Sequence, residues 1–232
     1  MTSSGKTVTD DYQDRCTGAD FCQEFSGSRD VTFTRIYGGN PASRMIVETR
    51  EFALIADLSP LTVGHLLFLP KAHFLSFAQA AMFRSAELHR VFGLVADLYS
   101  GTFGPPLILE HGSVADDDHT ACITHAHWHL VPLRHLQITR LMHADGLRPT
   151  PVRRLDIAPW PHTSYYLVGQ GDLDVFNVCH PDPRIPRQYV RSLIGRCLGM
   201  RDPEWDYAVM VRRELLRHTM QRTASWQQAV PP

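Results

Sequence analysis

The chain has 232 residues, of which 44% are hydrophobic and 20% charged, and its formal net charge is −1. This length allows one domain with a good core, or one domain with an appendage. The near-neutral charge argues against a protein that holds nucleic acid by bulk electrostatic attraction, since that mode needs a clear basic excess. No apolar run approaches the roughly 20 residues of a membrane-spanning helix, and residues 1–6 lead into polar sequence rather than a signal segment.

The cysteines predict a reduced, cytoplasmic protein. They are odd in number and widely spaced, whereas a disulfide framework in a small secreted domain pairs an even number of cysteines. We therefore expect free thiols. The residues are Cys16, Cys22, Cys122, Cys179 and Cys197.

The first part of the chain predicts a loose lead-in followed by strands. Residues 1–30 are rich in Ser, Thr, Asp and Gly and predict a loosely ordered segment. Residues 31–36 alternate with period two, which predicts a strand. Further strands are expected at 45–48, 52–58 and 64–70, and Pro70 closes the last one.

A long helix is predicted next. Ser76 suits an N-cap, and apolar side chains follow at helical spacing to about Tyr99, which we interpret as a core stripe. Glycines and prolines at 101–106 end the helix, and a strand is expected at 107–110. Strands flanking one long helix over residues 31–135 predict an α+β fold, an antiparallel sheet with one long helix.

Residues 136–232 predict a C-terminal α/β extension. After Pro132, arginines lie among apolar and proline residues and indicate a connector. Short strands are expected at 164–168 and 174–178 as a hairpin, then a helix at 186–198 ended by Gly199, and a last helix at 203–222.

Three alternating histidines carry the chemistry of this sequence. In a strand, alternate side chains project from the same face, about 6.5–7 Å apart per step, so His125, His127 and His129 share one side. Ala126, Trp128 and Leu130 then face the core. Such a row is exposed by chance, binds a metal, or is catalytic.

The metal interpretation remains an alternative at this point. Imidazole binds zinc and copper, and two histidines at i and i+2 on a strand are a common ligand pair. A further ligand must come from elsewhere in the chain. The candidates are His65, His73, Cys22 and the aspartates at 116–118.

Residues 125–131, His-Ala-His-Trp-His-Leu-Val, resemble the His-φ-His-φ-His-φ-φ signature of the histidine triad (HIT) family, in which φ is apolar. Supporting matches occur in the family's order and spacing. They are Asp57, Pro60, Gly64-His65, Leu69-Pro70-Lys71, His73 and Glu110-His111-Gly112. The resemblance covers roughly residues 20–135, a little over half of the chain.

The resemblance implies an enzyme that acts on the α-phosphorus of a nucleotide without a metal. His127 would be the nucleophile that forms a nucleotidyl-histidine, and its other ring nitrogen would donate to a backbone carbonyl. His125 and His129 would flank the phosphoryl oxygens, and His65 would complete the cluster.

The resemblance also implies the substrate-binding residues. Asp57 would bind the ribose hydroxyls, and Ile55 and Leu58 would line an apolar slot for the base. Glu110 and Cys122 stand where relatives place an amide and a small hydroxyl side chain, so both are candidates for substrate binding. A carboxylate at Glu110 is unfavourable beside phosphate unless it binds a cation, meets an amine on the substrate, or faces away.

The third histidine favours hydrolysis. Relatives that transfer nucleotides to phosphate or a sugar phosphate typically have glutamine there, whereas this chain has His129. The predicted substrate is a nucleoside phosphoramidate, a nucleotidyl ester or a dinucleoside polyphosphate. The alternatives are a nucleotidyltransferase or phosphorylase, a metal-dependent enzyme, and a nucleotide-binding module without turnover.

The resemblance bears on cofactors and partners as well. Many bacterial relatives hold a structural zinc through Cys-x-x-Cys, but here Ala19 stands where the partner of Cys22 would be, so we expect no metal and no cofactor. A nucleotide is the expected partner, and the family implies a homodimer whose sheets join. The basic residues of the segment 184–191 would either lie over the site or form a solvated face of a packed accessory segment.

Overall fold

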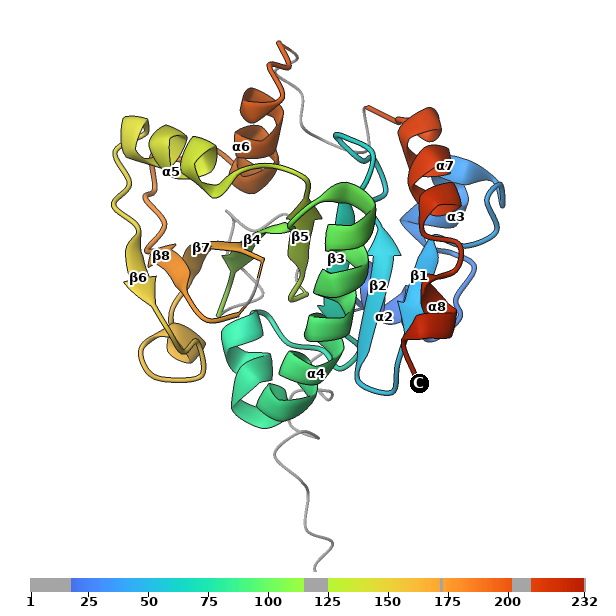
Figure 1. Cartoon of the computed structure of the whole chain (residues 1–232), viewed down its shortest axis with the longest axis horizontal. Coiled ribbons are helices and arrows are strands. Elements are labelled where there is room, and N and C mark those ends of the chain that lie inside the picture. Colours follow the sequence, from blue (N-terminus) through green and yellow to red (C-terminus); the bar gives the residue numbers. More distant parts are fainter. Residues whose placement is uncertain (1–17, 115–124, 172, 202–209, 232) are drawn as a thin grey trace, which may run out of the picture.

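The computed structural model describes residues 18–114, 125–171, 173–201 and 210–231. Eight strands form one sheet in the order β1-β2-β3-β5-β4-β7-β8-β6, and each neighbouring pair is antiparallel (Figure 1). The strands are β1 (Met45–Glu48), β2 (Phe52–Ala56), β3 (Leu66–Pro70), β4 (Leu107–Gly112), β5 (Trp128–Val131), β6 (Thr150–Val152), β7 (Tyr165–Gln170) and β8 (Phe176–Cys179). The predicted α+β class, an antiparallel sheet with one long helix, is confirmed.

The helices lie around this sheet. They are α2 (Asp20–Phe25), α3 (Thr32–Tyr37), α4 (Phe77–Phe103), α5 (His135–Ala144), the 3₁₀ helix η1 (Trp160–His162), α6 (Tyr189–Cys197), α7 (Arg213–Arg222) and α8 (Trp226–Ala229). Within the described ranges, no helix is both long and apolar enough to cross a membrane.

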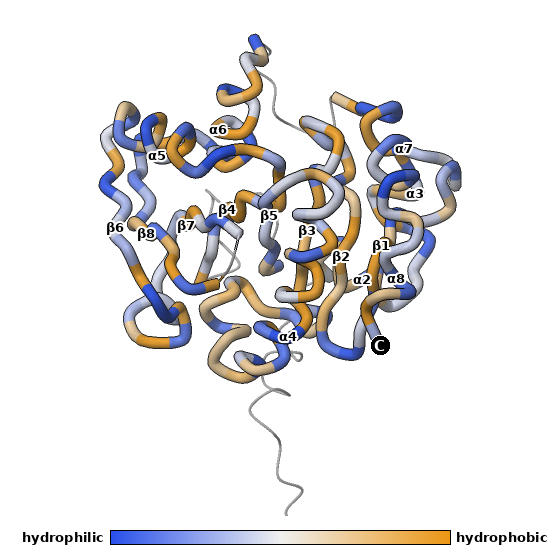
Figure 2. The backbone as a smooth tube through the Cα atoms, viewed as in Figure 1, coloured by the Kyte–Doolittle hydropathy of each residue, from blue (hydrophilic) through white to orange (hydrophobic). Residues whose placement is uncertain are grey.

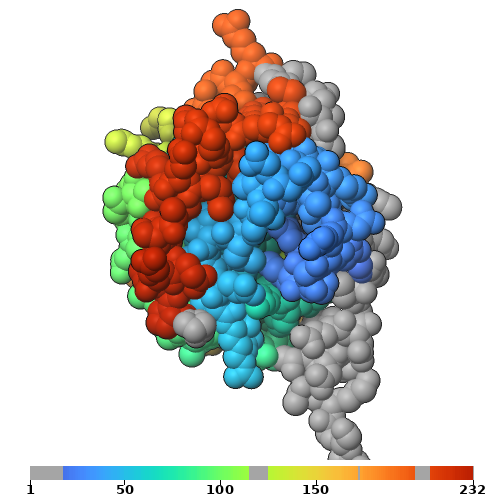
Figure 3. Space-filling model, turned by 90° about the vertical axis from the view of Figure 1, so that its right-hand side faces the viewer, coloured from blue at the N-terminus to red at the C-terminus, as the bar shows by residue number. Residues whose placement is uncertain are grey.

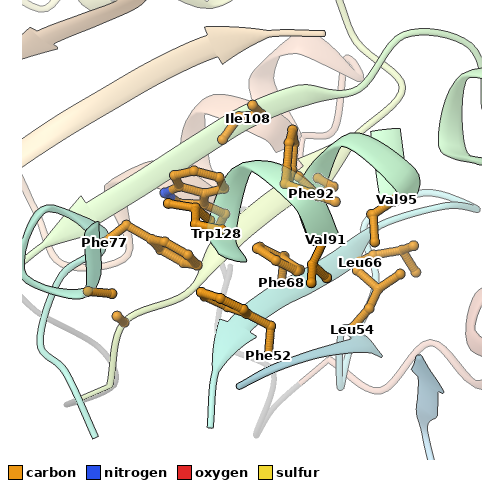
Figure 4. Packing of buried hydrophobic residues seen from close by; sticks show 14 of the residues in the cluster. Phe52, Leu54, Leu66, Phe68, Phe77, Val91, Phe92, Val95, Ile108 and Trp128 are labelled. Atoms are coloured by element: carbon orange, nitrogen blue, oxygen red, sulfur yellow. The ribbon is translucent and has the colours of Figure 1, made fainter. Parts of the chain in front are cut away.

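The long helix α4 covers one face of the sheet. Ser76 caps it, since its side chain accepts a hydrogen bond from the backbone of Gln79, as the sequence predicted. Beneath α4, the Trp128 ring stacks on Phe77 with centroids 4.0 Å apart (Figure 4). Strands β2 and β3 are buried along their whole length, and both are mostly hydrophobic in Figure 2. This aromatic packing fixes which side of β5 faces the core.

The opposite face of the sheet packs against two separate apolar clusters. Phe21 of α2 packs with Ile55 and Leu67, whereas α5 and α6 pack over β4 and β7. His129 lies between these two clusters. It pairs with Leu67 of the first cluster on β3 and with Leu109 of the second cluster on β4. The sheet therefore places His129 at the junction of two packed clusters. The predicted strand is shorter than expected, because β5 begins at Trp128 and both His125 and His127 precede it.

Residues 31–36 were predicted as a strand, which is wrong: α3 occupies residues 32–37. Phe33 and Tyr37 are both buried and their rings stack at 4.8 Å, so an i, i+4 pair prevails over the alternating pattern. Asp20, which lies 12 residues earlier in the chain, caps this helix, since its Oδ1 accepts a hydrogen bond from the backbone N–H of Thr32. Gly38 adopts a φ of 60° and ends it.

The connector predicted after Pro132 is also corrected, because residues 135–144 form α5 and residues 150–152 form β6. Ile138 and Met142 are completely buried at i, i+4 spacing, and the arginines around them hid this short apolar face. The helix predicted at 203–222 begins only at Arg213 as α7, and α8 follows it. Residues 202–209 lie outside the described residues.

The C-terminal extension continues the same sheet. The predicted hairpin is confirmed as β7 and β8, and β7 pairs with β4 at six consecutive positions, from Leu107↔Gln170 to Gly112↔Tyr165. The chain then returns to the first strand, where Gln227 Oε1 accepts a hydrogen bond from the backbone of Glu48. Figure 3 shows this C-terminal segment in red beside the blue N-terminal segments. The extension is thus integral to the fold.

Candidate active site

His127 has the tautomer that a nucleophile needs. It lies just before β5, is partly exposed, and its Nδ1 is 2.8 Å from the backbone oxygen of His125. Because a carbonyl only accepts, Nδ1 carries the proton, and Nε2 is left with its lone pair. Burial lowers the pKa of His127 below its ordinary value, so the ring is neutral at neutral pH.

A second pair of imidazoles lies beside it. The ring centroids of His127 and His129 are 5.0 Å apart, and His129 Nδ1 lies 2.9 Å from Nε2 of His65. The backbone N–H of Leu61 donates to Nδ1 of His65 over 3.2 Å, so the proton of His65 is on Nε2 and is donated to His129. The proton of neutral His129 must then be on Nε2, which makes this atom a donor.

Burial lowers the pKa of these histidines. His65 is completely buried, and burial lowers its pKa to about 4, although the Asp57 carboxylate acts in the opposite direction. Burial likewise holds the pKa of His129 well below its ordinary value, and the neighbouring rings of His127 and His65 add to the effect. Both are therefore neutral at neutral pH, which their hydrogen bonds also require.

Asp57 is held by an arginine of the C-terminal extension. Nη1 of Arg191 donates to both carboxylate oxygens at 3.0 and 2.9 Å, and Nη2 donates to the backbone oxygen of Ser59 at 2.8 Å. Burial alone would raise the pKa of Asp57, but the Arg191 guanidinium and His65 lower it well below its usual range. The carboxylate that was predicted to bind ribose is therefore paired within the protein, and its role toward a substrate stays a prediction.

His125 belongs to a different cluster. Its Nε2 donates to the backbone oxygen of Pro70 at 2.8 Å, and its Nδ1 faces Sγ of Cys22 at 3.4 Å. Sγ is also 3.3 Å from Nδ1 of His73. Both ring nitrogens of His125 thus point to protein atoms, so the predicted contact with a phosphoryl oxygen lacks a free ring nitrogen here.

Cys22, His73 and His125 are suitable metal ligands. Their ligand atoms lie within 4.8 Å of one another, and a thiolate with two imidazoles is a donor set that zinc prefers. Burial lowers the pKa of His125 to about 3, so its ring is neutral, as a ligand must be. The sequence argued against this site because of Ala19, yet the fold still assembles three ligands.

The apolar candidates are separated by the fold. Ile55 belongs to the apolar cluster that contains Phe21, whereas Leu58 belongs to the cluster that contains Trp128. Phe21 was not predicted, and its ring contacts His125 and His127 edge-on at 5.7 and 5.8 Å between centroids. Its position in a segment that looked loosely ordered concealed it, since only the packing of α2 brings it to the site.

Glu110 faces away from the histidines, so the structure does not bring this predicted substrate ligand to the site. Its carboxylate accepts hydrogen bonds from the Phe77 backbone at 2.7 Å, Trp128 Nε1 at 3.0 Å and the Tyr165 hydroxyl at 2.8 Å. These donors all lie on the α4 side of the sheet. Cys122, the other candidate near the phosphate, lies outside the described residues.

The motif, the order of the elements and the histidine cluster agree on one likeness. The chain resembles the histidine triad family. No family profile and no curated protein matches the chain. Several solved structures match the chain, each over about half of the length of this chain.

Three of these structures illustrate the likeness. A hypothetical histidine triad nucleotide-binding protein from Sulfolobus tokodaii is 29% identical over 44% of this chain and 67% of its own, with a TM-score of 0.33. A Zn-bound histidine triad family protein from Mycobacterium smegmatis is 24% identical over 45% and 76%, with a TM-score of 0.32. A HIT family protein from Bacillus anthracis is 19% identical over 57% and 99%, with a TM-score of 0.37.

Proposed function

We propose that this protein hydrolyses a nucleotide conjugate at its α-phosphorus through a covalent nucleotidyl-histidine on His127. The single observation that carries the proposal is the hydrogen bond from His127 Nδ1 to the His125 carbonyl, which leaves Nε2 unprotonated. That nitrogen attacks phosphorus in line and the leaving group departs with the P–O or P–N electron pair. The oxygen of a water molecule then bonds to phosphorus as the N–P bond breaks, and Nε2 regains its lone pair. The proton that this water loses balances the one that the leaving group takes up.

His129 is the proposed partner of this step. Its Nε2–H would donate to a phosphoryl oxygen as negative charge accumulates there, because Nδ1 is already occupied by His65. The substrate class remains a nucleoside phosphoramidate, a nucleotidyl ester or a dinucleoside polyphosphate. Phe21, whose ring contacts His127, and Ile55 of the same apolar cluster are the side chains proposed to contact the base.

The decisive experiment traps the intermediate. The protein is mixed with a panel of nucleotide conjugates, quenched within milliseconds, and analysed by mass spectrometry for an acid-labile nucleotide adduct on His127. His127→Asn should lose the adduct and reduce kcat by at least roughly 1,000-fold, since it removes the nucleophile. His143→Asn, which changes an exposed histidine on α5, serves as the control. Binding of nucleotide with neither an adduct nor turnover would contradict the proposal.

A transferase or phosphorylase is the second candidate, since it would form the same intermediate. Adding inorganic phosphate or a sugar phosphate and identifying the products by ³¹P NMR separates the two: the hydrolase releases the nucleoside monophosphate whichever acceptor is present. A metal-dependent enzyme would instead lose its turnover in the presence of a chelator.

A cytoplasmic homodimer also remains part of the proposal. Strand β4 is already paired with β5 and β7, and Gln227 bonds to the outer strand β1. A partner subunit would therefore have to use a surface other than β4. Light scattering after size-exclusion chromatography should give twice the mass of one chain.

A further inference from the structure

We infer that Arg191, which the C-terminal extension contributes, is a positioning residue of this site: it withdraws Asp57 from substrate binding and makes it the anchor of the His65–His129 pair. The inference rests on the proposed function for its catalytic meaning. The contact joins residues 134 positions apart, and both side chains are about 95% buried, with exposed fractions of 6% and 5%. Such a pair is costly to bury unless its geometry is well satisfied.

The geometry is well satisfied. Asp57 Oδ1 accepts from Arg191 Nη1 and from the backbone N–H of Ser59 at 2.8 Å, while Nη2 of Arg191 reaches the Ser59 oxygen. The guanidinium therefore binds a carboxylate and a carbonyl of the same turn at once. A planar donor with a fixed fork suits this arrangement, which a lysine would not reproduce.

The position of Asp57 determines the tautomer of His129, to which it is connected through His65. Asp57 Oδ2 lies 3.7 Å from Nε2 of His65, so its negative charge favours the proton on that nitrogen. The Leu61 N–H favours the same tautomer from the other side of the ring. His65 then donates to Nδ1 of His129 over 2.9 Å, and Nε2 of His129 becomes the donor that faces a substrate. Arg191 keeps Asp57 ionised and in place for this chain of contacts.

The pairing of Asp57 with Arg191 also affects how the site would recognise the sugar of a nucleotide. Arg191 occupies one lone pair on each oxygen of Asp57 and the Ser59 N–H a second on Oδ1, so one acceptor site, on Oδ2, remains, which is too few to bind two ribose hydroxyls in the predicted way. We expect the enzyme to discriminate little between ribonucleotide and 2′-deoxyribonucleotide conjugates, with kcat/KM values within about threefold of each other, because a lost hydrogen bond to a charged group costs far more than that.

The test uses the full-length protein and needs no substrate for its first part. Imidazole ¹⁵N NMR at neutral pH should show His129 as a single Nε2–H tautomer in the wild type. Arg191→Met should give a mixture of tautomers. The double variant Asp57→Asn/Arg191→Met, which leaves no unpaired buried charge, should also give a mixture and distinguishes positioning from a loss of folding. Arg184→Met, on the exposed segment before α6, is the matched control and should resemble the wild type.

The second part uses turnover. Arg191→Met should lower kcat by roughly 10- to 100-fold with little change in KM, as expected when a donor is misplaced. A single His129 tautomer in both Arg191 variants would overturn the inference, as would a strong preference for ribonucleotides in the wild type. Failure of the proposed function would instead appear as absence of the adduct with the NMR result unchanged.

Discussion

Glu110 is a buried carboxylate whose protonation is coupled to folding. Burial raises its pKa from 4.5 to about 7, although three donors partly offset this effect. Because the folded-state pKa lies above that of the unfolded chain, folding favours the protonated carboxyl. The contribution of Glu110 to stability is thus complete below pH 4.5 and is lost as the pH rises through 7.

We therefore expect Glu110 to lower the free energy of unfolding by about 2–3 kcal/mol between pH 5 and pH 8. Glu110→Gln removes the titrating carboxyl. The difference in unfolding free energy between wild type and variant should therefore change by about 2–3 kcal/mol from pH 5 to pH 8. Urea unfolding at both pH values measures it, with Glu214→Gln on the exposed face of α7 as the control. Parallel pH profiles for wild type and Glu110→Gln would show that the carboxyl stays ionised.

A second prediction about individual residues concerns Cys22, His73 and His125, which should bind a metal ion. We expect one equivalent of Zn²⁺ or Co²⁺ to bind, because these three ligand atoms are already brought together. Cys22→Ser should weaken binding by at least about tenfold, since it removes the only thiolate of the set. Co²⁺ titration followed by the thiolate charge-transfer absorption measures this, and Cys197→Ser on α6 is the control. An unchanged titration with Cys22→Ser would exclude the site.

At the scale of elements, β4 and β7 come close at Gly112. A Cβ added there would lie 2.6 Å from Cε1 and 2.8 Å from Cε2 of the Tyr165 ring. That ring is fixed, because its hydroxyl donates to Glu110 and accepts from the backbone of Ala78. The pairing of the extension with the core therefore requires glycine at this position.

Gly112→Ala should destabilise the fold by about 3 kcal/mol, since neither the backbone nor the Tyr165 ring can move freely. Gly93→Ala is the matched control: it lies on the exposed side of α4 with nothing within 4 Å of an added Cβ. This change should stabilise the fold by about 0.5–1 kcal/mol. Thermal unfolding monitored by circular dichroism compares the two, and equal melting temperatures would contradict the close packing of β4 on β7.

At the scale of the whole molecule, one sheet joins the two halves of the sequence. The predicted boundary after residue 135 falls at the start of α5, yet β4 pairs with β5 on one side of this boundary in the sequence and with β7 on the other. Leu107 and Leu109 are completely buried in the cluster that α5 and α6 complete. Removing the extension would expose this surface and open the edge of β4.

A chain that ends at residue 134 should therefore not form a soluble, folded monomer, because an open strand edge beside exposed apolar side chains favours aggregation. Size-exclusion chromatography and the dispersion of amide NMR signals test this against the full-length protein. Sharp, dispersed signals from a monodisperse truncated chain would show that residues 136–232 are dispensable for folding.

The sequence by itself determined the features that depend on local patterns. Alternation identified the histidine row, Ser76 and Gly199 marked two helix ends, and the residue spacing gave the resemblance and the α+β class. These features are legible because periodicity and capping act within a few residues of the chain.

Only the tertiary structure decided the contacts across long separations. It showed Asp57 paired with Arg191, Cys22 beside His73 and His125, and Glu110 turned into the core. Whether a carboxylate or thiol faces a substrate, a metal or another side chain depends on which segments the sheet brings together. Burial and partner charge, which set the pKa of each group, exist only once those segments are packed.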